Sequence, residues 1–263
     1  MTYAFTRSKI AAGLVLALTA VIIVLVWIRG ASGPVYIPIV ASILMGGIGY
    51  FASRLAANVL SSMENTRYLG YLHMELDPEK FLHYYESVPD HVKGDRTAVL
   101  SYLADGYWAA GRFDDAIAAM EKQLPEEVSL LGLSASRLAC YYLAKGDKAE
   151  ARHQLERLRA VVEKVRTSNP ALSSNLGETL ALYQQHLNAL NLQSVEEDYL
   201  KTAFSKAQYN IRRLEITQVL ALDALRRHDS AKAKEHLSYL TEHGGKTFYV
   251  SWAKEKLEEL SSF

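Results

Sequence analysis

Apolar residues follow two different patterns along this chain. Two uncharged apolar runs, residues 10–28 and 35–53, lie close to the N-terminus and are separated by the short segment Arg29–Pro34. A helix of nineteen residues rises about 28 Å, close to the ~30 Å thickness of a bilayer's hydrocarbon core. We therefore predict a transmembrane helical hairpin over residues 1–60, with spans at about 10–28 and 35–53.

A signal peptide followed by a core helix is the alternative interpretation of the first run. The apolar region of a signal peptide is usually about 7–15 residues long and ends at small residues that allow cleavage. The first run is longer, and it ends at Trp27-Ile28-Arg29. We therefore favour the hairpin.

Basic residues that flank the two runs indicate an orientation. Arg7 and Lys9 precede the first run, and Arg54 and Arg67 follow the second, whereas the connecting loop carries Arg29 alone. Cytoplasmic flanks of membrane helices are enriched in Lys and Arg. We expect a protein that is integral to the cell membrane, with both ends and the whole soluble domain in the cytoplasm.

Small residues recur at helical spacing within both runs, and small faces let membrane helices approach closely. They could pack the two spans against each other or form a seam between two copies, so a homo-oligomer stays open. The residues expected to take part in membrane helix packing are Gly13, Ala17, Ser42, Gly46 and Gly49.

From Asn65 onward, apolar residues recur with helical period, and no stretch alternates as a strand would. Residues 98–123 also align with residues 133–158 at an offset of 35 without a gap. The pattern of each unit predicts a helix, a turn at a glycine and a second helix. Small residues lie where the two helices of a pair would touch. The aligned positions are Leu103-Ala104 with Leu138-Ala139, Tyr107 with Tyr142, Gly111 with Gly146, and Ala116 with Ala151.

This pattern resembles the tetratricopeptide repeat (TPR) family, whose period is about 34 residues. Gly111-Arg-Phe-Asp-Asp-Ala-Ile117 matches the family's turn and second helix, although the closing Pro is absent at Val128 and Glu163. The resemblance implies an all-α fold for residues 61–263: a TPR-like α-solenoid of about five helix pairs, with a C-terminal capping helix over 247–260. We expect residues 163–173 to be an inserted loop.

The resemblance also implies a concave face, built mostly from the first helix of each pair, that binds a protein or peptide. Some members of the family hold a terminal carboxylate with a Lys and Asn clamp. No cation occupies the matching positions here, which puts that activity in doubt. The expected partner-binding groove consists of Ser101, Asp105, Trp108, Ser136, Cys140, Leu143, Gln218 and Leu222.

Charge and cysteine content argue against several other functions. Residues 1–60 carry four basic and no acidic side chains, so residues 61–263 carry 25 basic and 29 acidic ones, a net charge of −4. Nucleic-acid binding relies on clustered Lys and Arg, which argues against such a partner. Cys140 is the single cysteine, so neither an internal disulfide nor a cysteine-rich zinc site is expected.

No motif for a metal, a bound phosphate or an activated nucleophile stands out, and the eight histidines form no recognised zinc pattern. We therefore expect no catalytic residue, no metal, no cofactor and no enzymatic activity. The sequence favours a membrane-anchored TPR-like protein of bacterial type that acts as an adaptor or scaffold. The alternative is a structural, self-associating subunit of a membrane complex, such as an envelope or secretion assembly.

Overall fold

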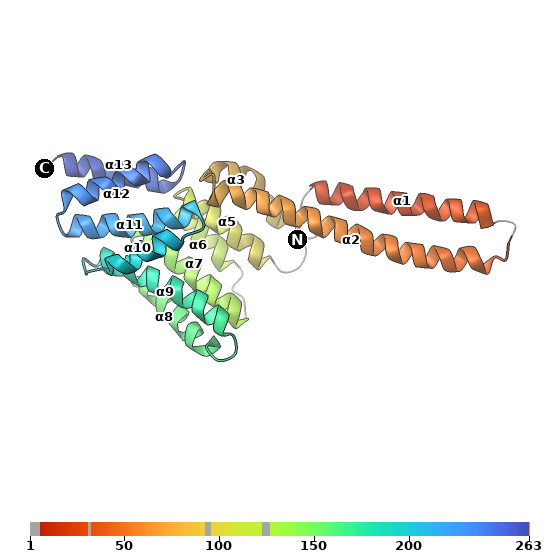
Figure 1. The fold of residues 1–263 in the computed structure, drawn as a ribbon, viewed down its shortest axis with the longest axis horizontal. Coiled ribbons are helices and arrows are strands. Elements are labelled where there is room, and N and C mark those ends of the chain that lie inside the picture. The colour runs from red at the N-terminus through yellow and green to blue at the C-terminus, as the bar shows by residue number, and fades with distance from the viewer. Residues whose placement is uncertain (1–5, 31–32, 93–95, 123–126, 263) are drawn as a thin grey trace. The chain divides into compact units, whose positions relative to one another are not determined.

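The structure is a computed structural model, and it describes residues 6–30, 33–92, 96–122 and 127–262. Within these ranges every regular element is an α-helix and no strand occurs, as Figure 1 shows. The predicted all-α fold class is therefore confirmed. In chain order the helices are α1 (Thr6–Gly30), α2 (Tyr36–His73), α3 (Pro78–Tyr85), α4 (Val88–His91), α5 (Thr97–Ala109), α6 (Phe113–Glu121), α7 (Val128–Lys145), α8 (Lys148–Val165), α9 (Pro170–Leu190), α10 (Glu197–Lys206), α11 (Asn210–Arg226), α12 (Ser230–His243) and α13 (Phe248–Ser261).

The two apolar runs form α1 and α2, which are both long and apolar enough to span a membrane. The helices are antiparallel and in contact. The Trp27 indole donates a hydrogen bond to Ser42 Oγ at 3.0 Å, and Gly49 lies directly against Thr19. Large apolar side chains such as Phe51 are exposed along both helices.

α2 continues for 38 residues, well past the second apolar run. The sequence offers no proline after Pro38 to interrupt it, and Gly70 lies within the helix without ending it. By its internal contacts the chain divides into two compact units. The first holds α1, α4 and α2 as far as Tyr68, and the second holds the residues from Leu69 to Glu86 and from Arg96 onward.

Two antiparallel helix pairs in the second unit, α5 with α6 and α7 with α8, coincide with the two aligned sequence units. Gly111 and Gly146 connect the helices of each pair with φ of +79° and +82°. This left-handed conformation costs glycine least, so the sequence expectation for both turns is confirmed. Ala104 and Ala116 are fully buried, as residues at a close helix contact should be.

The remaining helices of this unit pack in sequence, α8 with α9, then α11 with α12 and α12 with α13; Figure 1 shows the last three side by side. The inserted loop expected over residues 163–173 was wrong. α8 continues to Val165 and α9 begins at Pro170. The Asn169 side chain caps α9 by accepting a hydrogen bond from the Leu172 amide at 3.1 Å, and Pro170 is well suited to a first helical position.

Candidate functional site

The eight residues expected to line a groove lie on α5, α7 and α11, and most of them are covered by the protein's own side chains. Asp105 and Leu222 are partly buried. The other six are buried: Ser101, Trp108, Ser136, Cys140, Leu143 and Gln218. We call these eight residues the inner face. In this structure the inner face is an interior surface and not an open groove, and its role in binding stays a prediction.

Asp105 joins α5 to α7 across the inner face. Both of its carboxylate oxygens accept a hydrogen bond from Arg137 Nε at 3.0 Å, and Tyr141 Oη donates to Oδ1 at 2.6 Å. Burial and the nearby Asp105 carboxylate hold the pKa of Tyr141 well above its usual value. The phenol therefore stays protonated and acts as a fixed hydrogen-bond donor.

Glu215 makes the corresponding connection from α11 to α7. It accepts a hydrogen bond from Cys140 Sγ at 3.4 Å, and it forms an ion pair with Arg212 at 2.6 Å. Burial, together with the Glu215 carboxylate, raises the pKa of the Cys140 thiol well above its usual value. Since the thiolate is the nucleophilic form of cysteine, this site does not resemble an activated cysteine nucleophile.

Trp108 lies where α13 closes over the inner face. Its ring contacts Phe248 and Tyr249 of α13 at centroid distances of 5.8 and 6.1 Å, and Tyr141 of α7 at 6.3 Å. The indole Nε1 is buried and has no hydrogen-bond partner among the described residues. Trp108 also lines a small cavity of about 10 Å³ with Glu215 and other side chains, a volume of the order of one water molecule.

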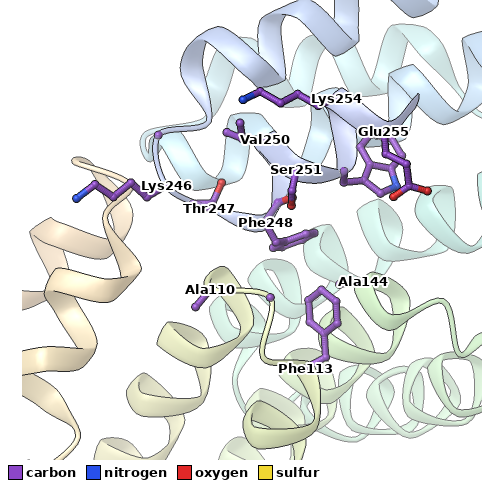
Figure 2. Close-up of a pocket in the computed structure, with 13 residues that line it drawn as sticks. Ala110, Phe113, Ala144, Lys246, Thr247, Phe248, Val250, Ser251, Lys254 and Glu255 are labelled. Atoms are coloured by element: carbon purple, nitrogen blue, oxygen red, sulfur yellow. The ribbon is translucent and has the colours of Figure 1, made fainter. Parts of the chain in front are cut away.

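An open groove of about 650 Å³ lies beside this closure, between the α5–α6 turn, the end of α7 and the first turns of α13. Figure 2 shows Phe248 extending from α13 toward Phe113, with Ala110 and Ala144 across the space. The rings of Phe113 and Phe248 meet edge to face at 5.1 Å. Trp252, one turn along α13, also lines the groove. We call this site the aromatic groove.

The three aromatic side chains of the groove are half-buried, and small residues give it depth. Ala110 and Ala144 line the side opposite α13 together with Gly111. A Cβ atom at Gly111 would lie 3.2 Å from Cβ of Phe248, so this approach of the turn to α13 also favours glycine. Charged side chains of Lys246, Lys254 and Glu255 complete the lining.

No protein-family model matches this chain, and no curated protein or solved structure matches it.

The aromatic groove was not among the sites predicted from the sequence. Phe113 is aligned with Lys148 in the following unit, so its aromatic character is not part of the repeat pattern. Phe248 and Trp252 are four residues apart, a spacing that places two side chains on the same helix face. The sequence thus contains an aromatic residue outside the repeat pattern and an aromatic pair on one helix face, but only the structure shows that these two segments lie together.

The residues expected to take part in membrane helix packing differ in burial between α2 and α1. On α2, Gly49 is buried, whereas Ser42 and Gly46 are partly buried. On α1, Gly13 and Ala17 are exposed. In α1 it is Ala12, at 3 % exposure, that is buried. Among the described residues, no group of three His, Cys, Asp or Glu side chains is arranged to hold a metal ion.

Proposed function

We propose that this protein is a membrane-anchored adaptor or scaffold whose TPR-like helical domain binds a segment of a protein partner, with the aromatic groove as the accessible contact site. The aromatic groove carries the proposal: three half-buried aromatic rings line an open site of about 650 Å³. Aromatic side chains dominate the binding energy of many protein interfaces. A groove of this size suits a few side chains of a peptide segment.

The rest of the chain supports an adaptor in simpler ways. Two helices able to span a membrane would anchor the domain, and the helix pairs at a 35-residue offset resemble a repeat family that commonly binds peptides. The polar groups of the inner face form hydrogen bonds and an ion pair between helices. They are not arranged around an accessible reaction centre, so we propose no enzymatic activity and no cofactor.

Site-specific photo-crosslinking in native membranes tests the proposal. A photoreactive amino acid replaces Trp252 in the groove, and the control replaces Leu192, which is 73 % exposed on the turn after α9. We expect one discrete adduct from position 252 that is absent at position 192 and weakened by Phe113→Ala.

Equal adducts at both positions, or none at position 252, would contradict the groove assignment. An adduct with the mass of two copies of this chain would instead support the self-associating subunit that the sequence left open.

A further inference from the structure

The segment Gly244–Tyr249, which we call the closing segment, joins the start of α13 to the turn that follows α2. The Lys246 amide donates a hydrogen bond to the Leu76 carbonyl at 2.9 Å, and Lys246 Nζ lies 2.6 Å from the Asp77 carboxylate. Gly245 has φ of +60° and approaches Leu76 closely. These contacts attach a segment late in the chain to one about 170 residues earlier.

A second pair of contacts also attaches a late segment of the chain to the turn after α2. Asn210, the first residue of α11, donates a side-chain hydrogen bond to the Met74 carbonyl at 2.8 Å, and the Tyr209 ring lies 5.5 Å from His73. The turn after α2 is therefore held by two separate segments of the C-terminal half.

Beyond its attachment points, the closing segment places two adjacent aromatic side chains against the inner face. Tyr249 is 1 % exposed and packs against Trp108. Phe248 contacts Trp108 on one side and Phe113 on the other. Without the closing segment, Trp108 would lose both of these aromatic neighbours.

The closure is incomplete in its hydrogen bonding, and its attachment to the turn after α2 lies at the surface. The indole Nε1 of Trp108 is buried without an acceptor among the described residues, and a buried donor that lacks a partner is costly. Lys246 is 67 % exposed, and an exposed ion pair stabilises a structure only slightly.

We propose that the closing segment is an intramolecular ligand of the inner face, and that the partner competes with it. The competing segment carries two adjacent aromatic residues and a hydrogen-bond acceptor, such as a carbonyl or carboxylate oxygen, for Trp108 Nε1. This inference rests on the proposed function: the partner first contacts the aromatic groove and then replaces Phe248 and Tyr249 on the inner face, which gives the partner a chemistry. It also makes binding dependent on release of the turn at Leu76 and Asp77.

Cys140 reports on this opening, because it is the only cysteine of the chain, is 8 % exposed, and lines the same small cavity as Trp108 and Tyr249 of the closing segment. The full chain is reacted with a thiol reagent in detergent or nanodiscs. Lys246→Glu removes the ion pair and places two like charges together, so we expect the rate of Cys140 labelling to rise about fivefold.

The matched control for this experiment is Lys145→Glu. Lys145 of α7 forms a similarly short ion pair, 2.6 Å, with Asp114 of α6 on the surface of the same unit. We expect its labelling rate to equal that of the wild type. Equal rates for the wild type and both variants would overturn the proposal, because the closing segment would then not control access to the inner face.

A peptide tests the competition itself. The labelled peptide GGKTFYVS reproduces residues 244–251, and the control peptide carries Ala in place of its Phe and Tyr. We expect the first peptide to bind the full-length Lys246→Glu/Phe248→Ala variant at least about tenfold more tightly than the wild type, and the control peptide to bind neither. Equal binding of the two peptides, or no binding of either, would overturn the proposal.

The Lys246→Glu variant alone, altered only at an exposed residue, gives the same comparison if the double variant does not fold. The two proposals fail separately. A crosslink at position 252 with unchanged Cys140 labelling would preserve the adaptor and remove the intramolecular ligand. Faster labelling with no crosslink would establish the opening and remove the aromatic groove as the contact site.

Discussion

Gly106 on α5 provides the sharpest test of how closely α3 packs in the second unit. A Cβ atom at this position would lie 2.5 Å from Cε1 and 2.6 Å from Cδ1 of Phe81. Phe81 cannot easily move away, because it is fully buried and its ring stacks on Tyr85 at 4.7 Å. Gly106→Ala should therefore force a shift of α3 or of the buried ring.

The expected magnitude is the difference between two terms. Replacing a glycine within a helix by alanine stabilises the helix by about 1 kcal/mol, whereas overpacking a rigid core costs about 1–3 kcal/mol. Because the ring is fixed, we expect the upper end of that cost and a net loss of about 2 kcal/mol. Gly177 on α9 is the matched control, because a Cβ atom there meets nothing within 4 Å.

The assay is thermal unfolding of the full chain in detergent, followed by circular dichroism. A change of 1 kcal/mol shifts the melting temperature of a domain of this size by roughly 2–4 °C. Gly106→Ala should melt roughly 4–8 °C below the wild type, and Gly177→Ala about 2 °C above it. If both variants melt above the wild type, then helix propensity dominates at both sites and the close packing of Phe81 on α5 is refuted.

Three further predictions follow from other parts of the molecule. Burial lowers the pKa of His186 to about 4 from 6.5, so between these pH values the unfolded chain binds a proton that the native state does not. The free energy of unfolding should therefore fall by at most about 3 kcal/mol as the pH drops from 6.5 to 4. Unfolding of His186→Gln, measured over the same pH range, should lack this loss of stability. Gly49→Leu should separate α1 from α2 by steric overlap, measured as loss of a crosslink between cysteines placed in the two helices, and a retained crosslink would refute the contact. A tag after Phe263 should resist protease in sealed, right-side-out cells while a tag within residues 29–34 is cleaved, and the reverse pattern would overturn the cytoplasmic orientation.

Local patterns predicted the helices well, because their causes lie close together in the sequence. The 35-residue offset identified both helix pairs, and Gly111 and Gly146 marked their turns by the conformation that glycine alone adopts easily. The expected loop near residue 163 failed for an equally local reason. Asn169-Pro170 was interpreted as part of a break, whereas it caps and begins α9.

The candidate site could not be predicted in the same way. The residues of the inner face lie on α5, α7 and α11, and their burial depends on contacts such as Cys140 with Glu215, which are 75 residues apart. The contact of Lys246 with Asp77 is between an ordinary surface lysine and a helix-capping aspartate. Neither residue carries a sequence signal for the other, so only the folded chain reveals the closure.

The attachment of Lys246 to the turn after α2 also has a consequence for biosynthesis. The two side chains that form this ion pair are 169 positions apart, and a ribosome adding about 5–20 residues per second needs roughly 10–30 s to traverse that distance. Trp108 is synthesised within this interval, 140 residues before Phe248, whose ring contacts it in the folded chain. A partner that is present during translation therefore meets the uncovered surface before the chain's own segment can occupy it.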